Sequence, residues 1–261
     1  MRSNERFLTV DGSAGKLRVS DGGEGGVPVV FVHGLGSDLE VWRAQLDHLR
    51  PARRALALDL RGHGGSEPAK GGVYTIPTLA SDVDAVVSRL GLQRFILVGH
   101  SMAGAVLTAY AGRHPEKVVG LVYVDAVGDV SGAPPEMKAM FTHAPPNFGP
   151  EQLRAAYGEM IGPVAKPGTR AQVLASADRM GPNTFLALRR ALADYVPTDD
   201  IKRYTGPRRA IEVAGVDMPF TASRSLPNVT RTTLPNVSHW LMLDDPEGFN
   251  RELDAALANI K

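Results

Sequence analysis

The chain contains no cysteine in its 261 residues. Disulfide bonds, thiolate catalysis and cysteine-ligated zinc are therefore excluded. An excess of charge of one sign is also lacking, because 29 basic residues stand against 28 acidic ones and the formal net charge is +1. Such a balance provides no general electrostatic attraction for nucleic acid or for an anionic membrane. We therefore expect neither as a partner.

Long hydrophobic runs are missing as well. The longest apolar stretches have the length of a strand and fall short of the roughly 20 residues that a membrane helix needs. Residues 1–11 are polar and charged, which is not the pattern of a signal peptide. These absences favour a cytoplasmic protein. The length fits one large domain, or a domain that carries an insertion.

What the sequence does contain is a series of short, unbroken apolar runs. Strands buried on both faces, as in a parallel sheet, have this composition. The runs occupy residues 29–32, 55–58, 95–98 and 121–124. A hairpin is predicted before them at 6–10 and 16–20, and further strands at 210–214 and 230–234. Helical patterns lie at 79–90, at 102–113 and from 246 onward. The alternation predicts an α/β fold, with a mostly parallel central sheet flanked by helices.

One long segment departs from this alternation. Residues 128–204 show helical periodicity but no strand pattern, and they are rich in methionine, phenylalanine and proline. Because structureless loops of this length are uncommon, we predict a helical insertion here. The rest of the chain, residues 1–127 and 205–261, is then the core domain.

The clearest chemical signal is a serine at a turn between a strand and a helix. The apolar run 95–98 leads into Gly99-His100-Ser101-Met102-Ala103-Gly104. At such a sharp turn the serine oxygen is held out above the sheet, and small residues are needed two positions before and after it. Ala103 stands where glycine is more usual. We predict Ser101 as a nucleophile, although a βα turn without catalytic function has the same residues.

A serine hydroxyl needs a base to accept its proton. His239 is best placed, because it lies in the loop between the last predicted strand and the last predicted helix. The other histidines lie in glycine-rich loops, on helix faces, beside the nucleophile or in the insertion: His33, His63, His48, His114, His100 and His143.

Acyl transfer also requires N–H donors for the developing oxyanion. The loop after the run 29–32 would bring the amide of Leu35 near the nucleophile. The amide of Met102, at the positive end of the helix that follows Ser101, is the natural second donor. A glycine-rich loop of this kind can instead hold phosphate. However, neither the dinucleotide fingerprint nor the P-loop pattern occurs, which disfavours nucleotide binding.

Four motifs in succession resemble the α/β-hydrolase superfamily. They are His33-Gly34 with Trp42, then Asp59-Leu-Arg-Gly-His-Gly-Gly-Ser66, then the segment 99–104 around Ser101, then Ser238-His239-Trp240-Leu-Met-Leu-Asp-Asp-Pro246. The order is that of the superfamily and covers nearly the whole chain outside the insertion. The resemblance implies an α/β-hydrolase fold in which residues 128–204 form a helical cap over the active site. It implies a mainly structural turn at 59–66, and it does not select one activity.

The acidic partner of the histidine has two candidates. Most members of the superfamily carry it after the seventh strand, where this chain has Asp217, although the span to His239 is shorter than usual. A smaller subset places it at the end of the sixth strand, where this chain has Asp125. Both positions stay open, with Asp125 slightly favoured. Asp244 and Asp245 follow His239 too closely to orient it, and we expect them to begin the last helix.

The nucleophile narrows the reaction. Dehalogenases and epoxide hydrolases of the superfamily attack with aspartate, whereas Ser101 favours acyl transfer from an ester, thioester, lactone or amide. We predict a serine hydrolase that cleaves an ester-type bond of a small, largely apolar substrate through an acyl-enzyme, without a cofactor or metal. The residues expected to line the substrate site are His33, Gly34, His100 and Trp240. Carbon–carbon bond hydrolysis, perhydrolysis, cofactor-free oxygenation and a non-catalytic ligand receptor stay open as alternatives.

Overall fold

The computed structural model describes residues 4–260, and its strands form a single eight-stranded sheet. The order across the sheet is β1-β2-β4-β3-β5-β6-β7-β8. Strands β1 and β2 run antiparallel to each other, β2 runs antiparallel to β4, and all pairs from β4 onward are parallel. The strands are β1 (Arg6–Gly12), β2 (Gly15–Gly22), β3 (Val29–Val32), β4 (Ala55–Leu58), β5 (Phe95–His100), β6 (Val118–Val124), β7 (Arg208–Val213) and β8 (Val229–Leu234). The predicted fold class is confirmed.

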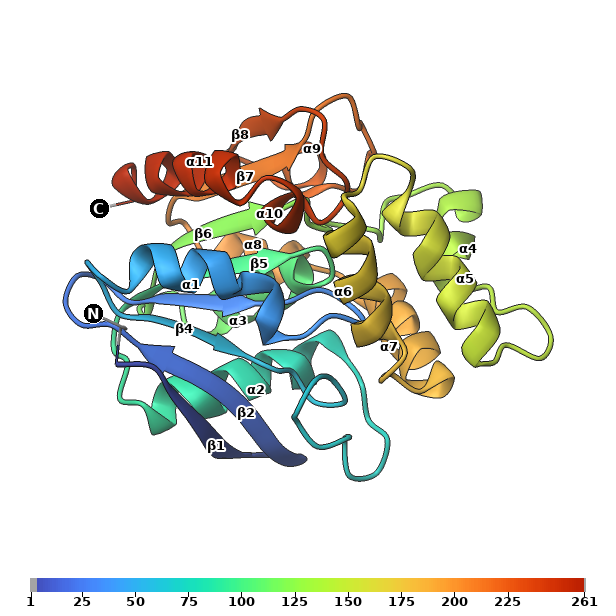
Figure 1. The fold of residues 1–261 in the computed structure, drawn as a ribbon, viewed down its shortest axis with the longest axis horizontal. Coiled ribbons are helices and arrows are strands. Elements are labelled where there is room, and N and C mark those ends of the chain that lie inside the picture. The colour runs from blue at the N-terminus through green and yellow to red at the C-terminus, as the bar shows by residue number, and fades with distance from the viewer. Residues whose placement is uncertain (1–3, 261) are drawn as a thin grey trace.

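Helices cover both faces of this sheet (Figure 1). On one face α1 (Arg43–Leu49) packs against α11 (Pro246–Ala258). On the other face α3 (Ala103–Arg113) packs between α2 (Ile76–Arg89) and α8 (Thr198–Arg203). The start of α2 is fixed by a capping box in which Thr75 and Thr78 each bond the other's backbone. Short helical turns η1 (Leu39–Trp42), α9 (Ala222–Ser225) and α10 (Leu241–Asp244) lie in the connecting loops.

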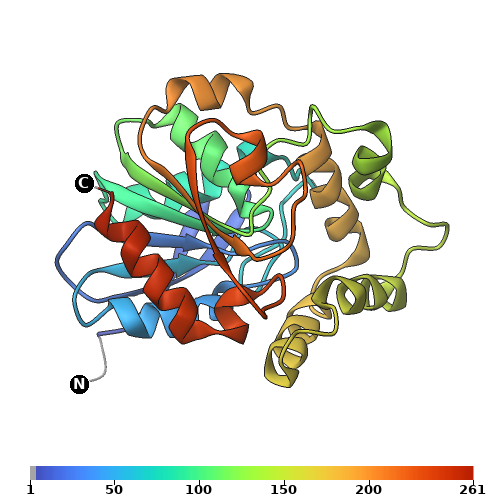
Figure 2. The same cartoon turned by 90° about the horizontal axis from the view of Figure 1, so that it is seen from above.

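The remaining helices form a separate group beyond the carboxyl ends of the parallel strands, clearest in Figure 2. They are α4 (Pro135–Thr142), α5 (Pro150–Ile161), α6 (Pro167–Ala177) and α7 (Pro182–Asp194). Each carries a proline in its first turn, where the missing N–H costs no hydrogen bond. We call α4–α7 the helical group. It lies where ligands gather in open α/β sheets.

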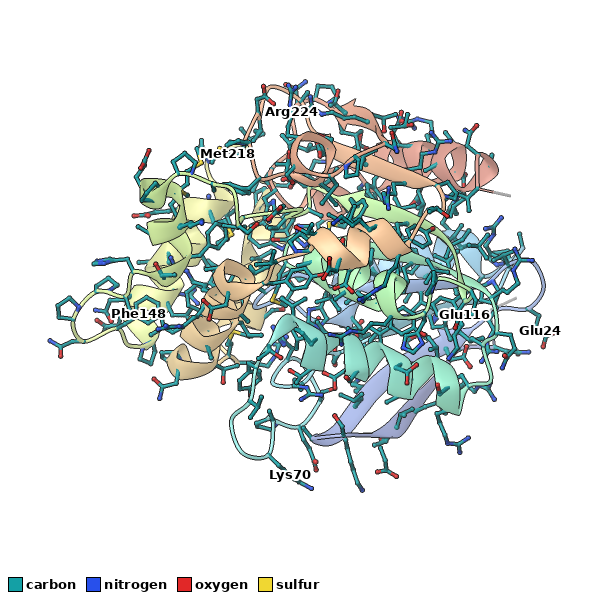
Figure 3. All side chains as sticks on the ribbon, turned by 180° about the vertical axis from the view of Figure 1, so that it is seen from behind. Glu24, Lys70, Glu116, Phe148, Met218 and Arg224 are labelled. Carbon is teal, nitrogen blue, oxygen red and sulfur yellow. The ribbon has the colours of Figure 1, made fainter. Side chains whose placement is uncertain are left out.

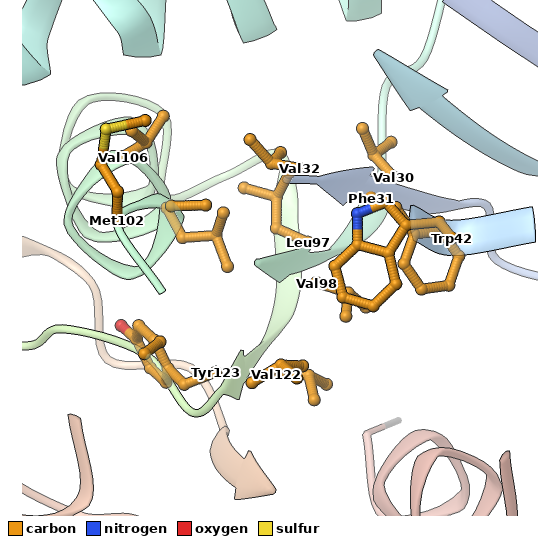
Figure 4. Close-up of a cluster of buried hydrophobic side chains, with 14 of the residues drawn as sticks. Val30, Phe31, Val32, Trp42, Leu97, Val98, Met102, Val106, Val122 and Tyr123 are labelled. Carbon is orange, nitrogen blue, oxygen red and sulfur yellow. The ribbon is translucent and has the colours of Figure 1, made fainter. Parts of the chain in front are cut away.

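The core is built from the central strands and the helices that cross them. All residues of β3, β4, β5 and β6 are buried, which explains why their sequences do not alternate between apolar and polar. Figure 4 shows Phe31 beside Trp42, whose ring centroids are 5.0 Å apart, and Met102 beside Val106 on the neighbouring helix. This packing holds the ends of β3, β5 and β6 in fixed positions. Within residues 4–260, no helix combines the length and the apolarity that crossing a bilayer requires.

Candidate active site

Ser101 occupies a strained turn directly after β5. Its φ angle is 53°, in the left-handed region that residues other than glycine seldom adopt. The turn is fixed from three sides: the Ser101 amide donates to Val124 O at 3.0 Å, and its carbonyl accepts from the amides of Gly104 and Val127, each at 3.0 Å. A strained conformation that is so fully held by neighbouring backbone is typical of functional sites.

Two glycines make this turn possible. A Cβ on Gly104 would lie 2.3 Å from the carbonyl oxygen of Val127, and a Cβ on Gly99 would lie 2.6 Å from the side chain of Leu107. A larger residue at 104 would have to move the backbone of Val127, and one at 99 would have to move the buried side chain of Leu107. The predicted need for a small residue before the serine thus has a direct steric cause, and Gly104, rather than position 103, carries the tightest contact after it.

His239, in the loop after β8, reaches Asp125, which follows β6. Its Nδ1 lies 2.6 Å from Oδ2 of Asp125, and the other carboxylate oxygen accepts from the amide of Val213 at 3.3 Å. Since an ionised carboxylate only accepts, Nδ1 carries the proton and Nε2 is left with its lone pair. Asp125 also has a positive φ, 40°, and its amide donates to Ile211 O at 2.9 Å. The acid therefore sits after β6 in a second strained turn, adjacent to that of Ser101.

Asp217 points away from the histidine. Its carboxylate pairs with Arg224 through two hydrogen bonds, of 2.5 and 2.7 Å, and its side chain is 61% exposed. In Figure 3 Arg224 lies on the outer side of this loop, and Met218 lies nearer to the helical group. Of the two acids that the sequence leaves open, the structure brings Asp125 to His239 and engages Asp217 in a surface ion pair.

Ser101 and His239 line the same cavity, but within residues 4–260 no hydrogen bond joins Ser101 Oγ to His239 Nε2. In active sites without substrate this bond is often long and tightens only when the substrate binds. The two residues thus share one site, although they are not in hydrogen-bond contact in this structure.

The two predicted oxyanion donors lie beside Ser101. The loop after β3 packs against the serine turn so closely that a Cβ on Gly34 would be 2.9 Å from Cβ of Ser101. Within the described part of the chain, neither the amide of Leu35 nor that of Met102 donates a hydrogen bond to another protein group. Both residues line the cavity. These amides are donors available to a ligand.

His33 is a correction to the predicted substrate contacts. Its ring is fully buried and does not line the cavity. Nε2 accepts from the amide of Leu60 at 3.0 Å, so Nδ1 carries the proton and donates to Gly34 O at 2.8 Å. The side chain positions the loop of Gly34 from behind instead of meeting a ligand. Gly34 is also outside the cavity lining and serves by its close approach to Ser101.

His100 and Trp240 do line the cavity, as expected. Nε2 of His100 bonds His239 O at 2.9 Å, and the rings of the two histidines are 4.5 Å apart. Burial, together with the neighbouring His239, holds the pKa of His100 well below its ordinary value, so its ring stays neutral. The Trp240 indole donates to Ser37 Oγ at 3.2 Å. Both residues therefore fix the loop that carries His239.

The cavity itself has a volume of about 650 Å³ and lies between the strand ends and the helical group. Most of its lining is apolar. The lining comes from α4, α5, the loop after α5 and α7, from the loop after β7, and from the segments around Leu35, Ser101, Asp125 and His239. Several apolar residues at its rim are exposed to solvent: Met140, Met160, Val164 and Val216. Such a site suits a ligand with an apolar body.

Sequence reasoning missed the contacts that join the helical group to the site. The phenol of Tyr157, on α5, donates to the carbonyl of Leu35 at 2.8 Å. Ser176 Oγ, on α6, donates to Asp38 at 2.9 Å, and Arg179, just after this helix, pairs with the same carboxylate. Burial alone would raise the pKa of Asp38, but the hydrogen bond from Ser176 and the neighbouring charges keep it below its ordinary value. No local motif marks these partners, because they are far apart in the sequence.

Asp244 is a second correction. It does not begin the last helix; Asp245 does, by accepting from the amide of Gly248 at 2.9 Å. Asp244 accepts from the amide of Ser238 at 2.7 Å and from that of Lys166 at 2.9 Å. Burial raises its pKa, yet these hydrogen bonds outweigh burial and leave the pKa below the ordinary value. One carboxylate thus ties the loop of His239 to the start of α6.

The segment 59–66 is a structural turn, as the resemblance implies. Asp59 accepts from the amides of Leu39 at 2.7 Å and Gly65 at 2.8 Å, and burial raises its pKa. Arg61 and Asp82 form a buried ion pair in which two nitrogens meet the carboxylate. None of the three charged groups lines the cavity. Their bonds hold the loop after β4 in place.

The chain is similar in sequence to a protein family and to proteins of known function. The family model described as the alpha/beta hydrolase fold matches residues 27–164. A dihydrolipoyllysine-residue acetyltransferase component of an acetoin cleaving system, from Cupriavidus necator, is 37% identical over 123 residues, which are 47% of this chain and 32% of that protein. The chain thus matches about a third of the length of that relative.

Solved structures match over almost the full length. A bromoperoxidase from Bacillus anthracis has a TM-score of 0.83 at 21% identity, over 98% of this chain and 100% of that chain. A thermophilic esterase from Thermogutta terrifontis has a TM-score of 0.77 at 23% identity, over 98% and 99%. At these identities the likeness concerns the fold.

Proposed function

The chain belongs to the α/β-hydrolase family and is a hydrolase-type enzyme, and from this premise we propose that it cleaves a carboxylic ester, thioester or lactone through an acyl-enzyme on Ser101. The observation that carries the proposal is the contact between His239 Nδ1 and Asp125 Oδ2 at 2.6 Å. It leaves Nε2 of His239 as a base on the side of the cavity that Ser101 also lines.

In the proposed first half-reaction, Nε2 of His239 takes the proton of Ser101 Oγ as that oxygen bonds to the carbonyl carbon. The carbonyl oxygen becomes an oxyanion and accepts from the amides of Leu35 and Met102, whose donors have no protein acceptor in the described structure. The tetrahedral intermediate collapses, the bond to the leaving oxygen or sulfur breaks, and His239 returns the proton to it.

In the second half-reaction, water loses a proton to His239 and attacks the acyl carbon. Collapse of the second intermediate breaks the bond to Ser101, and the proton returns from His239 to Oγ. The carboxylate of Asp125 holds the imidazole in the tautomer that both steps need, and it stabilises the cation formed in each. The proposed steps use the side chains of Ser101, His239 and Asp125, the two main-chain amides and water.

The helical group is proposed to act as a cap that selects the substrate. It contributes apolar residues to the cavity, including Met140, Phe141 and Phe185. A volume of about 650 Å³ accommodates a small to medium substrate. We therefore propose that the acyl or alcohol part of the substrate is largely apolar.

The test is hydrolysis of p-nitrophenyl butyrate, which is measured by the release of p-nitrophenol. The wild-type protein is expected to turn over the ester with a burst, and Ser101→Ala to lose at least about a thousandfold in kcat. Mass spectrometry after treatment with a fluorophosphonate should locate the adduct on Ser101. Hydrolysis that persists in Ser101→Ala, or labelling at another residue, would overturn the assignment. Tight binding of esters without turnover would instead favour a ligand receptor.

A further inference from the structure

One cation projects into the otherwise largely apolar cavity. Arg189 lies on α7 and belongs to the cavity lining, and its guanidinium is 5.4 Å from the ring centroid of Phe185. Its side chain is half-buried rather than extended into solvent. Contact with the aromatic face supports the positive charge but fills none of the five N–H donors of the guanidinium.

Within residues 4–260, Arg189 makes no ion pair and no side-chain hydrogen bond to another protein group. Its neighbour Arg190 behaves in the ordinary way, being 75% exposed and paired with Asp194 on the same helix at 3.5 Å. Burial lowers the pKa of Arg189, which shows that the charged form is partly desolvated. A partly desolvated cation without an anion is less favourable than a paired one, and no group of the described protein pairs with it.

The other charged groups of the cavity do not neutralise Arg189. Asp125 is engaged by His239. Glu159, on α5, is exposed and does not form an ion pair with Arg189. The one titratable neighbour that raises the pKa of Arg189 is the phenol of Tyr157, which is neutral because burial raises its own pKa and which already donates to Leu35. A place for one negative charge is therefore left in the cavity.

We propose that Arg189 forms a subsite for a carboxylate of the substrate, so that the enzyme acts on esters or lactones that carry a second, ionised carboxyl group. The planar fork of the guanidinium matches a carboxylate with two parallel N–H···O bonds. A monoanion fits better than a phosphate dianion, because one cation would leave a net negative charge in a largely apolar cavity. The reaction in this proposal rests on the proposed function, whereas the substrate class rests on Arg189.

The test compares two esters of one leaving group: mono-p-nitrophenyl glutarate, which carries a free carboxylate, and neutral p-nitrophenyl valerate. The measured quantity is the ratio of their kcat/KM values. In Arg189→Met this ratio is expected to fall by about ten- to a hundredfold, the usual effect of losing charged hydrogen bonds. Arg190→Met is the matched control and should keep the wild-type ratio. An unchanged ratio in Arg189→Met, or an equal fall in Arg190→Met, overturns the subsite.

A binding measurement separates this proposal from the reaction. Calorimetric titration of Ser101→Ala with 4-phenylbutyrate and with neutral 4-phenylbutanol compares a carboxylate with its alcohol on the same apolar body. The carboxylate should bind at least about tenfold more tightly, and adding Arg189→Met should remove the difference. If neither ester is hydrolysed but this preference is found, the ester chemistry fails and the subsite stands. If both esters are hydrolysed and the preference is absent, the subsite fails and the ester chemistry stands.

Discussion

The phenol of Tyr157 and the carbonyl of Leu35, held 2.8 Å apart by a hydrogen bond, join the helical group to the loop that carries a proposed oxyanion donor. The Leu35 amide belongs to the preceding peptide unit, so fixing the carbonyl limits the rotation of the whole residue. The same phenol fills the space above Gly36, where a Cβ would lie 1.8 Å from its oxygen. Packing of α5 therefore bears directly on the geometry next to Ser101.

Tyr157→Phe should show this coupling. Removing the hydroxyl frees the carbonyl of Leu35, and we expect kcat to fall about fivefold with little change in KM, since the loss affects the transition state. Steady-state kinetics with p-nitrophenyl butyrate measures the effect. Tyr195→Phe is the control, because the Tyr195 hydroxyl donates to Asp200 at 2.9 Å and the residue does not line the cavity. Equal kcat values in both variants would argue against a positioning role for Tyr157.

The two aspartates left open by the sequence should differ sharply. Asp125→Asn replaces the acceptor of the His239 Nδ1 proton and favours the wrong tautomer, so kcat should fall by about ten-thousandfold. Asp217→Asn breaks only an exposed ion pair with Arg224 and should change kcat less than about twofold. Single-turnover measurements isolate the chemical step. A large loss in Asp217→Asn with a mild one in Asp125→Asn would reverse the assignment.

Glycine substitutions on either side of the Tyr157 contact should act in opposite directions. Gly36 has a φ of 66° and no room for a Cβ, so Gly36→Ala should destabilise the fold by at least about 1 kcal/mol and displace the phenol. Gly158, in the middle of α5, faces open space, and Gly158→Ala should stabilise the protein by up to about 1 kcal/mol. Urea unfolding of both variants gives the two values. Stabilisation by Gly36→Ala would contradict the described packing.

Acid should weaken the fold through two buried histidines. Burial holds the pKa of both His63 and His100 well below the ordinary value, so the unfolded chain binds protons that the folded one does not. This stability is complete above about pH 6.5 and is lost as the pH falls below it, by up to about 1.4 kcal/mol per pH unit for each histidine. Urea unfolding between pH 8 and 5.5 measures the slope. His63→Gln should reduce it, whereas His143→Gln, at an exposed position, should not.

The order of the helices and strands could be predicted because local sequence patterns specify each of them. Apolar runs such as 29–32 and 95–98 are buried on both faces, and the structure contains strands at each of them. The turn at Ser101 could also be predicted, because the strand, the small residues and the helix that form it are contiguous in the sequence. The family match over residues 27–164 covers the same stretch.

What the sequence did not reveal depends on contacts between distant segments. Nothing near His33 in the sequence indicates that both its ring nitrogens are used by backbone groups, and this is why a ligand contact was wrongly expected. Asp244 looks like its neighbour Asp245, yet only the fold brings the amide of Lys166 to it. The bonds of Tyr157 and Ser176 likewise cross from the insertion to the core. The choice between Asp125 and Asp217 rests on the direction of two side chains, which no local pattern specifies.

Because the carboxylate that meets His239 follows β6, the proposed chemistry uses no side chain of the loop after β7. Val216, Met218 and Phe220 of that loop face the cavity, while Asp217 is occupied at the surface. Exchange of these cavity-facing side chains can reshape one side of the pocket without replacing Ser101, His239 or Asp125. Changes in substrate range, in nature or in laboratory evolution, could therefore arise by substitution in this loop with little loss of catalytic activity.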